Sequence, residues 1–310
     1  MRDIETLVNK YMAKNNFTEC SHPNCFEETI YSHSISKSIS LKTIAEKDHL
    51  VFFKPRRFKS IKKPKFETID VNQCSAFNGF CKEHDDMFQD IDLNKITTSE
   101  HLKLQVFRTL CCELNKEKVG VEFLQEPTDE EAIKLLVSRG VIEDASEVIG
   151  NFIELSKKKI KFLQRESFED RLYKIERLVV YFYRILKFGD LFRFDTNEKT
   201  VFATDNLNTQ VLYYMTDFLI SVAVSTKVTY DIDQGMDYYL IVIPYEDSTL
   251  IMCIVPDGSP IIVQEKINES FKSKLSIIKF VESIISSCDG WYIKPSVIYN
   301  MTEDKKYFFK

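Results

Sequence analysis

The sequence lacks the long hydrophobic runs and the leader pattern that mark membrane and secreted proteins. Its longest apolar runs, Tyr238–Tyr245 and Leu250–Pro256, are far shorter than the roughly 20 residues of a membrane helix. The first residues, MRDIETLVNKYMAK, carry charges throughout and follow the pattern of an amphipathic helix, with no secretory signal. We therefore expect a cytoplasmic protein with no membrane segment.

Several enzyme motifs and any excess of positive charge are absent as well. There is no P-loop, no dinucleotide-binding glycine fingerprint and no Gly-x-Ser-x-Gly elbow. The net charge is −5, so binding to nucleic acid or acidic lipid has to come from a local patch. Eight cysteines in a chain of 310 residues do not indicate a disulfide scaffold.

Histidine is missing from most of the chain. All five histidines lie at or before position 101, and four of the eight cysteines lie at or before position 81. Residues 102–310 contain no histidine. This uneven distribution separates a front segment that is rich in metal-ligand side chains from a remainder that is poor in them.

Two closely spaced pairs of these residues predict a zinc site. Cys20 and Cys25 flank a Ser-His-Pro-Asn turn, and Cys81 and His84 are separated by two residues. Zinc prefers four thiolate or imidazole ligands in a tetrahedron, and small domains supply them as such pairs. We expect these four residues to hold one structural zinc ion. His22 and Cys74 remain alternative ligands.

The sequence between the two pairs carries a resemblance to a nuclease family. The segment 31–38 reads YSHSISKS, with His33 at the end of a strand candidate. The order of features resembles that of the zinc-stapled HNH nucleases of the treble-clef, His-Me finger group. These features are a cysteine pair, a strand ending in histidine, an Ile-x-Lys-Ser run and a second pair at a helix start. The resemblance covers residues 20–92. The stretch GFCKEHD at 79–85 is also similar to uncharacterised bacterial proteins suspected of phage-defence roles.

The resemblance implies a metal-dependent endonuclease. His33 would be the general base that deprotonates the attacking water, and Mg²⁺ or Mn²⁺, distinct from the structural zinc, would stabilise the developing charge. Asp85 stands where the family usually has asparagine, and it would orient His33 or bind the metal. Ser32 precedes His33 where the family often has an acid, and Phe88 and Gln89 stand where a second histidine is usual. These departures favour the alternative, a non-catalytic zinc-stapled module that binds nucleic acid or protein.

A basic stretch lies between the two ligand pairs. Residues 54–65 read KPRRFKSIKKPK, with seven positive charges and no acid. In an acidic chain such a stretch is suited to phosphate contacts, although a solvated loop is the alternative. The candidate nucleic-acid-binding residues are Lys54, Arg56, Arg57, Lys59, Lys62, Lys63 and Lys65.

Hydrophobic periodicity predicts an α+β fold in three parts. We expect a small treble-clef or HNH-like module at 1–95, a helical region at 96–198 and a mixed α+β unit at 199–310. Expected helices cover 1–14, 99–118, 127–140, parts of 143–188, 206–221 and 268–287. Expected strands cover 26–31, 50–54, 201–202, 222–230, 238–243, 250–255 and 261–263, with a hairpin turn at 256–259. Residues 143–310 are the candidate surface for a homo-oligomer or a partner protein, and Trp291 is expected at the edge of the last unit.

Overall fold

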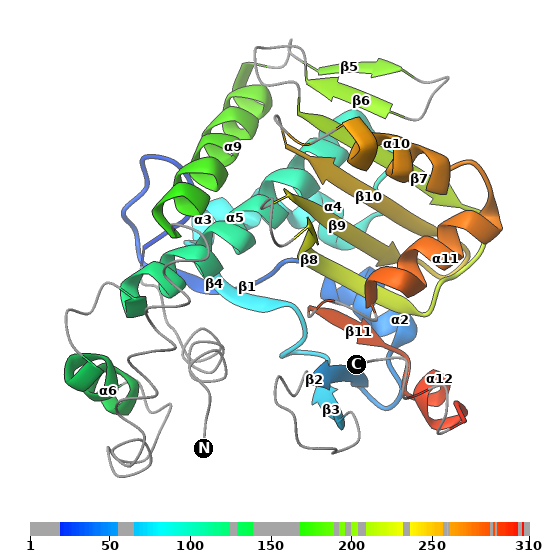
Figure 1. Cartoon of the computed structure of the whole chain (residues 1–310), viewed down its shortest axis with the longest axis horizontal. Helices are drawn as coiled ribbons and strands as arrows, with labels where there is room; N and C mark the ends of the chain where they lie inside the picture. Colours follow the sequence, from blue (N-terminus) through cyan, green and yellow to red (C-terminus); the bar gives the residue numbers. More distant parts are fainter. Residues whose placement is uncertain are drawn as a thin grey trace. The chain divides into compact units, whose positions relative to one another are not determined.

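A computed structural model gives the architecture of the chain, and it confirms the α+β class (Figure 1). The structure describes residues 19–54, 65–124, 129–138, 168–188, 192–195, 200–203, 209–231, 236–256, 259, 261–285, 288, 290–302 and 306. The chain forms two compact units: residues 1–31, 78–85 and 110–181 belong to the first, and residues 32–77, 86–109 and 182–310 to the second. Within the described residues, no helix combines the length and the apolarity that crossing a membrane requires.

The second unit is built on a nine-stranded sheet whose neighbouring strands are antiparallel. In spatial order the strands are β3 (Lys65–Asp70), β2 (His49–Lys54), β11 (Trp291–Ile293), β8 (Val222–Asp231), β9 (Met236–Pro244), β10 (Thr249–Val255), β7 (Gln210–Thr216), β6 (Thr200–Ala203) and β5 (Phe192–Asp195). The sheet therefore joins strands from all three predicted segments, since β5 lies within 96–198.

Two helices cover one face of this sheet. The helices α10 (Ile261–Ser270) and α11 (Lys274–Ile285) lie across β8, β9 and β10 (Figure 1). Their apolar side chains, including Val263, Ile277 and Val281, pack into one buried cluster with strand residues. Every residue of β10 is buried, so this strand is covered on both of its faces. A strand of this kind reads as a continuous apolar run rather than an alternating one.

The short strand β11 connects the front hairpin to the rest of the sheet. It pairs with β2 on one side and with β8 on the other. Trp291 is 1% exposed, and its ring lies parallel to that of Phe53 with centroids 6.1 Å apart. Among the strands of residues 199–310, β11 is an outermost one, as expected for Trp291, and its pairing with β2 makes it an interior strand of the complete sheet. Gly290 precedes it with φ of +80°, and an added Cβ would lie 3.1 Å from the Cβ of Thr226 on β8. A side chain there would be strained in φ and crowded against β8.

The remaining elements carry the candidate site and its surroundings. A two-stranded sheet pairs β1 (Ile30–His33) with β4 (Ala76–Phe80), and the short helix α3 (Lys82–Asp86) follows β4 directly. The other helices are the π-helical turn η1 (Lys37–Leu41), α2 (Lys42–Ile44), α4 (Gln89–Leu93), α5 (Ser99–Leu124), α6 (Asp129–Ser138), α9 (Phe168–Phe188) and α12 (Pro295–Tyr299).

Three secondary-structure predictions differ from the structure. The segment expected as a helix at 206–221 contains β7, which pairs with β10 over seven positions and with β6 on its other side. The segment 261–263, expected as a strand after a hairpin turn, is the first turn of α10. The single helix expected at 268–287 is divided, because α10 ends at Ser270 and α11 begins at Lys274.

Other predictions either agree with the structure or fall outside it. The helix expected at 99–118 is α5, which extends to Leu124, and the strand expected at 50–54 is β2. The helix expected at 1–14 lies outside the described residues, as does the portion 143–167 of the periodic stretch. The three-part division at 95 and 198 and the assembly surface at 143–310 stay predictions.

Candidate functional site

The first ligand pair lies on a tight loop. The backbone N–H of Cys25 donates to the carbonyl of His22 at 3.1 Å, which closes the turn. Asn24 has φ of 62°, a left-handed conformation that asparagine tolerates better than most residues. The N–H of Cys20 donates to the carbonyl of Glu27 at 3.1 Å, so the two arms of the loop are held together. Both thiols therefore sit at the ends of one closed turn.

The second pair lies at the beginning of α3. The N–H of Asp85 donates to the carbonyl of Cys81 at 2.9 Å, which makes the first helical turn. Residues three apart on such a turn share one face, so Cys81 and His84 project to the same side. A backbone hydrogen bond of 2.6 Å from the N–H of Ser21 to the carbonyl of Gly79 ties the loop to the end of β4.

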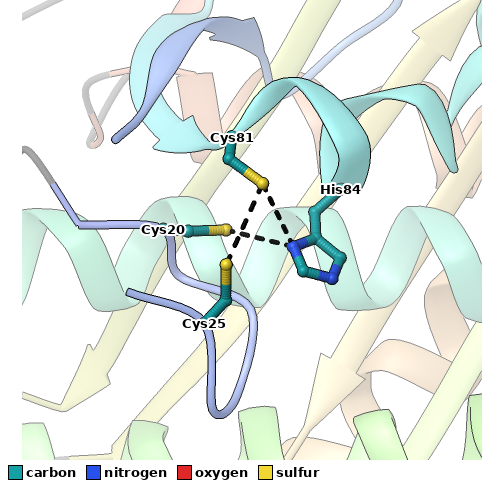
Figure 2. A group of neighbouring side chains, drawn as sticks. All are labelled: Cys20, Cys25, Cys81 and His84. Carbon is teal, nitrogen blue, oxygen red and sulfur yellow. Dashed lines mark hydrogen bonds between the residues drawn. The ribbon is translucent and has the colours of Figure 1, made fainter. Parts of the chain in front are cut away.

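The four side chains converge on one point (Figure 2). Their ligand atoms all lie within 4.8 Å of one another. Nδ1 of His84 lies 3.6 Å from Sγ of Cys20 and 3.2 Å from Sγ of Cys81, and the Sγ atoms of Cys25 and Cys81 are 3.9 Å apart. The spacing of the two pairs in the sequence therefore identified residues that come together in space.

Two of these distances, 3.6 Å and 3.9 Å, match the edges of a zinc tetrahedron, and the third, 3.2 Å, is shorter than its edge. Bonds of about 2.3 Å to sulfur and about 2.0–2.1 Å to nitrogen place two sulfurs about 3.8 Å apart and a sulfur and a nitrogen about 3.6 Å apart. Three thiols and one imidazole are a donor set that structural zinc sites use. The cluster could therefore hold a metal ion such as zinc.

Burial keeps the thiol of Cys20 protonated when no cation is bound. Burial raises the pKa of Cys20 to about 12, and this increase exceeds the decrease caused by hydrogen bonds from the backbone of Cys81 and His22. A thiolate at this position is unfavourable unless a positive charge accompanies it. Bound metal supplies that charge, because a coordinating thiol is deprotonated.

Neighbouring groups support the cluster from outside. The ring of His22 stacks on that of His84, with centroids 3.6 Å apart and planes 9° from parallel. The thiol of Cys111 on α5 is fully buried and lies 3.8 Å from the carbonyl of Ser21. Of the two alternative ligands, His22 takes this stacking position, and Cys74 belongs to the second unit, where its thiol donates to the carbonyl of Asp70 at 3.4 Å.

His33 ends β1, and its ring is held by a backbone carbonyl within the same unit, the second. Its Nε2 donates to the carbonyl of Asn72 at 3.1 Å. A carbonyl oxygen only accepts, so Nε2 carries the proton and Nδ1 of the neutral ring carries the lone pair. Burial is the largest influence on the pKa of His33 and lowers it, and the charges of Lys37 and Arg108 lower it further. The hydrogen bond to Asn72 and the charge of Asp92 act in the opposite direction.

A buried ion pair next to His33 was not identified from the sequence. Arg108 on α5 is 2% exposed and donates from Nη1 to Oδ1 of Asp92 at 2.8 Å. Its Nη2 donates to Oε1 of Gln105, and its guanidinium lies over the ring of Phe88 at 4.9 Å from the centroid. Gln105 in turn donates to the carbonyl of Ser34 at 2.9 Å. The sequence carries no signal for this network, because Arg108 lies on the side of the helix opposite to Val106 and Leu110.

The other predicted site residues are placed only in part. Asp85 lies in α3 with a half-buried side chain. Lys54 ends β2 and Lys65 begins β3, and the two residues are partners in the antiparallel register, so the basic stretch starts and finishes at one end of a hairpin. Arg56, Arg57, Lys59, Lys62 and Lys63 lie outside the described residues.

Comparison of the chain with protein-family models, curated proteins and solved structures finds no match.

Proposed function

We propose that the chain is a metal-dependent nucleic-acid endonuclease in which one structural zinc ion orders the front module and His33 is the general base. The observation that carries the proposal is the hydrogen bond from Nε2 of His33 to the carbonyl of Asn72. It orients the ring and leaves the lone pair on Nδ1. A general base requires that lone pair at neutral pH, and the lowered pKa of His33 keeps the ring neutral there.

The chemistry is hydrolysis of a phosphodiester. The water oxygen forms a new bond to phosphorus, a water proton passes to Nδ1 of His33, and the bond from phosphorus to the leaving oxygen breaks. A divalent ion such as Mg²⁺ or Mn²⁺, when bound, supplies positive charge to the phosphate and the leaving oxygen. Asp85 is the carboxylate that we propose as its ligand or as a partner of His33.

The order of the elements supports the same proposal. A loop with two thiols is followed by β1, which ends in His33 and pairs with β4, and α3 follows β4 at the second ligand pair. In the sequence, η1, α2, β2 and β3 lie between β1 and β4. Apart from this insertion, the pairing of β1 with β4 before α3 is similar to the ββα centre of the nuclease family that the sequence motifs resemble. A zinc ion at the four ligands would order a segment with little apolar core of its own.

A cleavage assay with matched histidine variants tests the proposal. Purified protein is incubated with plasmid DNA and with RNA in the presence of Mg²⁺ or Mn²⁺, beside His33→Ala and His49→Ala. His49 is an exposed histidine whose Nδ1 also bonds a backbone carbonyl, that of Lys47, at 2.6 Å. We expect cleavage by the wild type and by His49→Ala and loss of about 10²-fold or more in His33→Ala. No cleavage by any protein, or equal cleavage by all three, rejects the base.

The second candidate is a non-catalytic zinc-stapled module that binds nucleic acid. The residue before His33 favours it, because Ser32 is 1% exposed and offers no carboxylate for a metal. This alternative predicts that the wild type and His33→Ala bind a labelled oligonucleotide equally and that neither cleaves it. Zinc content distinguishes both candidates from a protein without the metal, since each requires about one zinc per chain.

A further inference from the structure

We propose that Lys37 binds a phosphate of the nucleic-acid backbone next to His33, and that Asn72 holds the two side chains in position. The inference rests on the proposed function and assigns it a substrate-binding residue. Lys37 lies outside the basic stretch 54–65, and it belongs to the Ile-x-Lys-Ser run whose lysine the cleavage proposal does not use.

Asn72 contacts both side chains at once. Its carbonyl accepts from Nε2 of His33 at 3.1 Å, and its side-chain Oδ1 accepts from Nζ of Lys37 at 3.2 Å. Asn72 is itself fixed, because its backbone N–H and its Nδ2 both donate to Oδ1 of Asp70 at 2.8 Å. The base and the ammonium group are therefore attached to one rigid residue.

The backbone that carries Lys37 is also anchored. Ser36 caps the turn η1, and its Oγ donates to the carbonyl of Asp92 at 2.9 Å. The hydroxyl of Ser38 donates to the same carbonyl. The carboxylate of Asp92 is paired with the buried Arg108 at 2.8 Å. The residues on both sides of Lys37 are thus bound to α4, and α4 is tied to α5.

Lys37 keeps capacity for a further ligand. An ammonium group has three N–H donors, and the hydrogen bond to Asn72 uses one of them. The side chain is half-buried, so it reaches solvent while its position is constrained. In a chain with a net charge of −5, a cation beside the base is a local attraction for a phosphate. The same cation lowers the pKa of His33, which favours the unprotonated ring.

Binding measurements on an inactive background test the assignment. Fluorescence anisotropy with a short labelled single-stranded DNA is recorded over a salt series for His33→Ala, and for the same protein with Lys37→Met or Lys42→Met. Lys42 is an exposed lysine of the following helix α2 and serves as the matched control. We expect Lys37→Met to weaken binding and to lower the slope of log K against log salt by about 0.7, the value for one phosphate contact to a single strand. Lys42→Met should leave both quantities unchanged.

Further variants separate phosphate binding from a structural role. Lys37→Arg keeps the charge and should retain most of the binding, and Lys37→Met should keep the wild-type zinc content and melting temperature. In the active protein, Lys37→Met should raise KM more than it lowers kcat. Equal binding and equal salt slopes for Lys37→Met and Lys42→Met overturn the assignment even if His33→Ala abolishes cleavage. Conversely, a wild type that never cleaves rejects the proposed function, while the binding series still decides whether Lys37 contacts phosphate.

Discussion

His33 shows how one residue couples folding to pH. In the unfolded chain this ring takes up a proton near its ordinary pKa of 6.5, whereas burial, Lys37 and Arg108 lower the pKa of the folded ring. Below pH 6.5 the unfolded state therefore binds more protons than the folded state, and the free energy of unfolding falls as the pH falls. The stability that the neutral ring contributes is fully present above pH 6.5 and is lost on acidification through the lowered folded pKa.

The pH dependence of stability in a His33 variant tests this coupling. We expect His33→Gln, which cannot titrate, to lose less stability than the wild type between about pH 7 and pH 5. The measurement is the free energy of unfolding from urea titrations at a series of pH values. His49→Gln, at an exposed site, should follow the wild type. If the free energy of unfolding of His33→Gln falls with pH as steeply as that of the wild type, the titration of His33 does not influence folding.

At the scale of single residues, the sequence allowed prediction of the site residues that are recognisable by side-chain type and spacing. Cys20, Cys25, Cys81 and His84 were identifiable because thiols and imidazoles in close pairs are uncommon. The partner of His33 was not identifiable, because it is the backbone carbonyl of Asn72, which lies 39 positions away. Every residue has such a carbonyl, so no residue type signals its role.

At the scale of elements, local pattern failed where pairing across the sheet decides the structure. The sequence of β7, QVLYYMT, has β-branched and aromatic residues, but it lies within a window that also supports helical periodicity. Its pairing with β6 and β10 buries Val211 and Leu212 and selects the strand. The opposite error occurred at 261–263, where a helix was expected to be a strand. A window of three apolar residues is too short to distinguish a strand from the first turn of α10.

The strand β11 was missed for a related reason, and its importance can be measured. It has three residues, and Trp291 fills the space beside Phe53 and Phe66, whose ring centroids lie 6.1 and 6.5 Å from the tryptophan ring. Replacing a buried tryptophan by alanine removes its contacts and leaves a cavity. We expect Trp291→Ala to lower the free energy of unfolding by about 3–5 kcal/mol.

Two further substitutions serve as controls for the loss of stability expected in Trp291→Ala. Trp291→Phe keeps an aromatic ring and should recover part of the stability. Leu275→Ala, at a side chain that is 61% exposed, should change the free energy of unfolding by less than about 0.5 kcal/mol. Urea denaturation of the three variants provides the values. If Trp291→Ala lowers the free energy of unfolding no more than Leu275→Ala does, β11 does not stabilise the sheet.

At the scale of the whole molecule, we infer that the sheet unit and the ligand-bearing segments of the first unit depend on different sources of stability. The sheet unit buries a large apolar cluster and has long antiparallel ladders, so its order follows from the hydrophobic effect and backbone hydrogen bonds. The pairing of the early strand β2 with the late strand β11 could not be predicted, because pairs such as Tyr292 with Phe52 join distant parts of the chain. The segments around the ligands are short and loop-like, and we infer that a metal ion supplies much of their order.

Removal of the metal should therefore affect the two units unequally. After zinc is removed with a chelator, we expect backbone amides in 19–31 and 78–85 to exchange hydrogen faster, while amides in β8, β9 and β10 remain protected. Cys25→Ser should show the same pattern without chelator, because it removes one ligand of the cluster. Cys288→Ser, at a half-buried thiol outside the cluster, should keep both the metal and the protection. Hydrogen exchange read by mass spectrometry gives the comparison, and metal analysis confirms that zinc has been lost.

Unchanged protection of 19–31 in the metal-free protein would show that the loop folds without zinc. Equal loss of protection in β8, β9 and β10 would show instead that the metal stabilises the sheet as well.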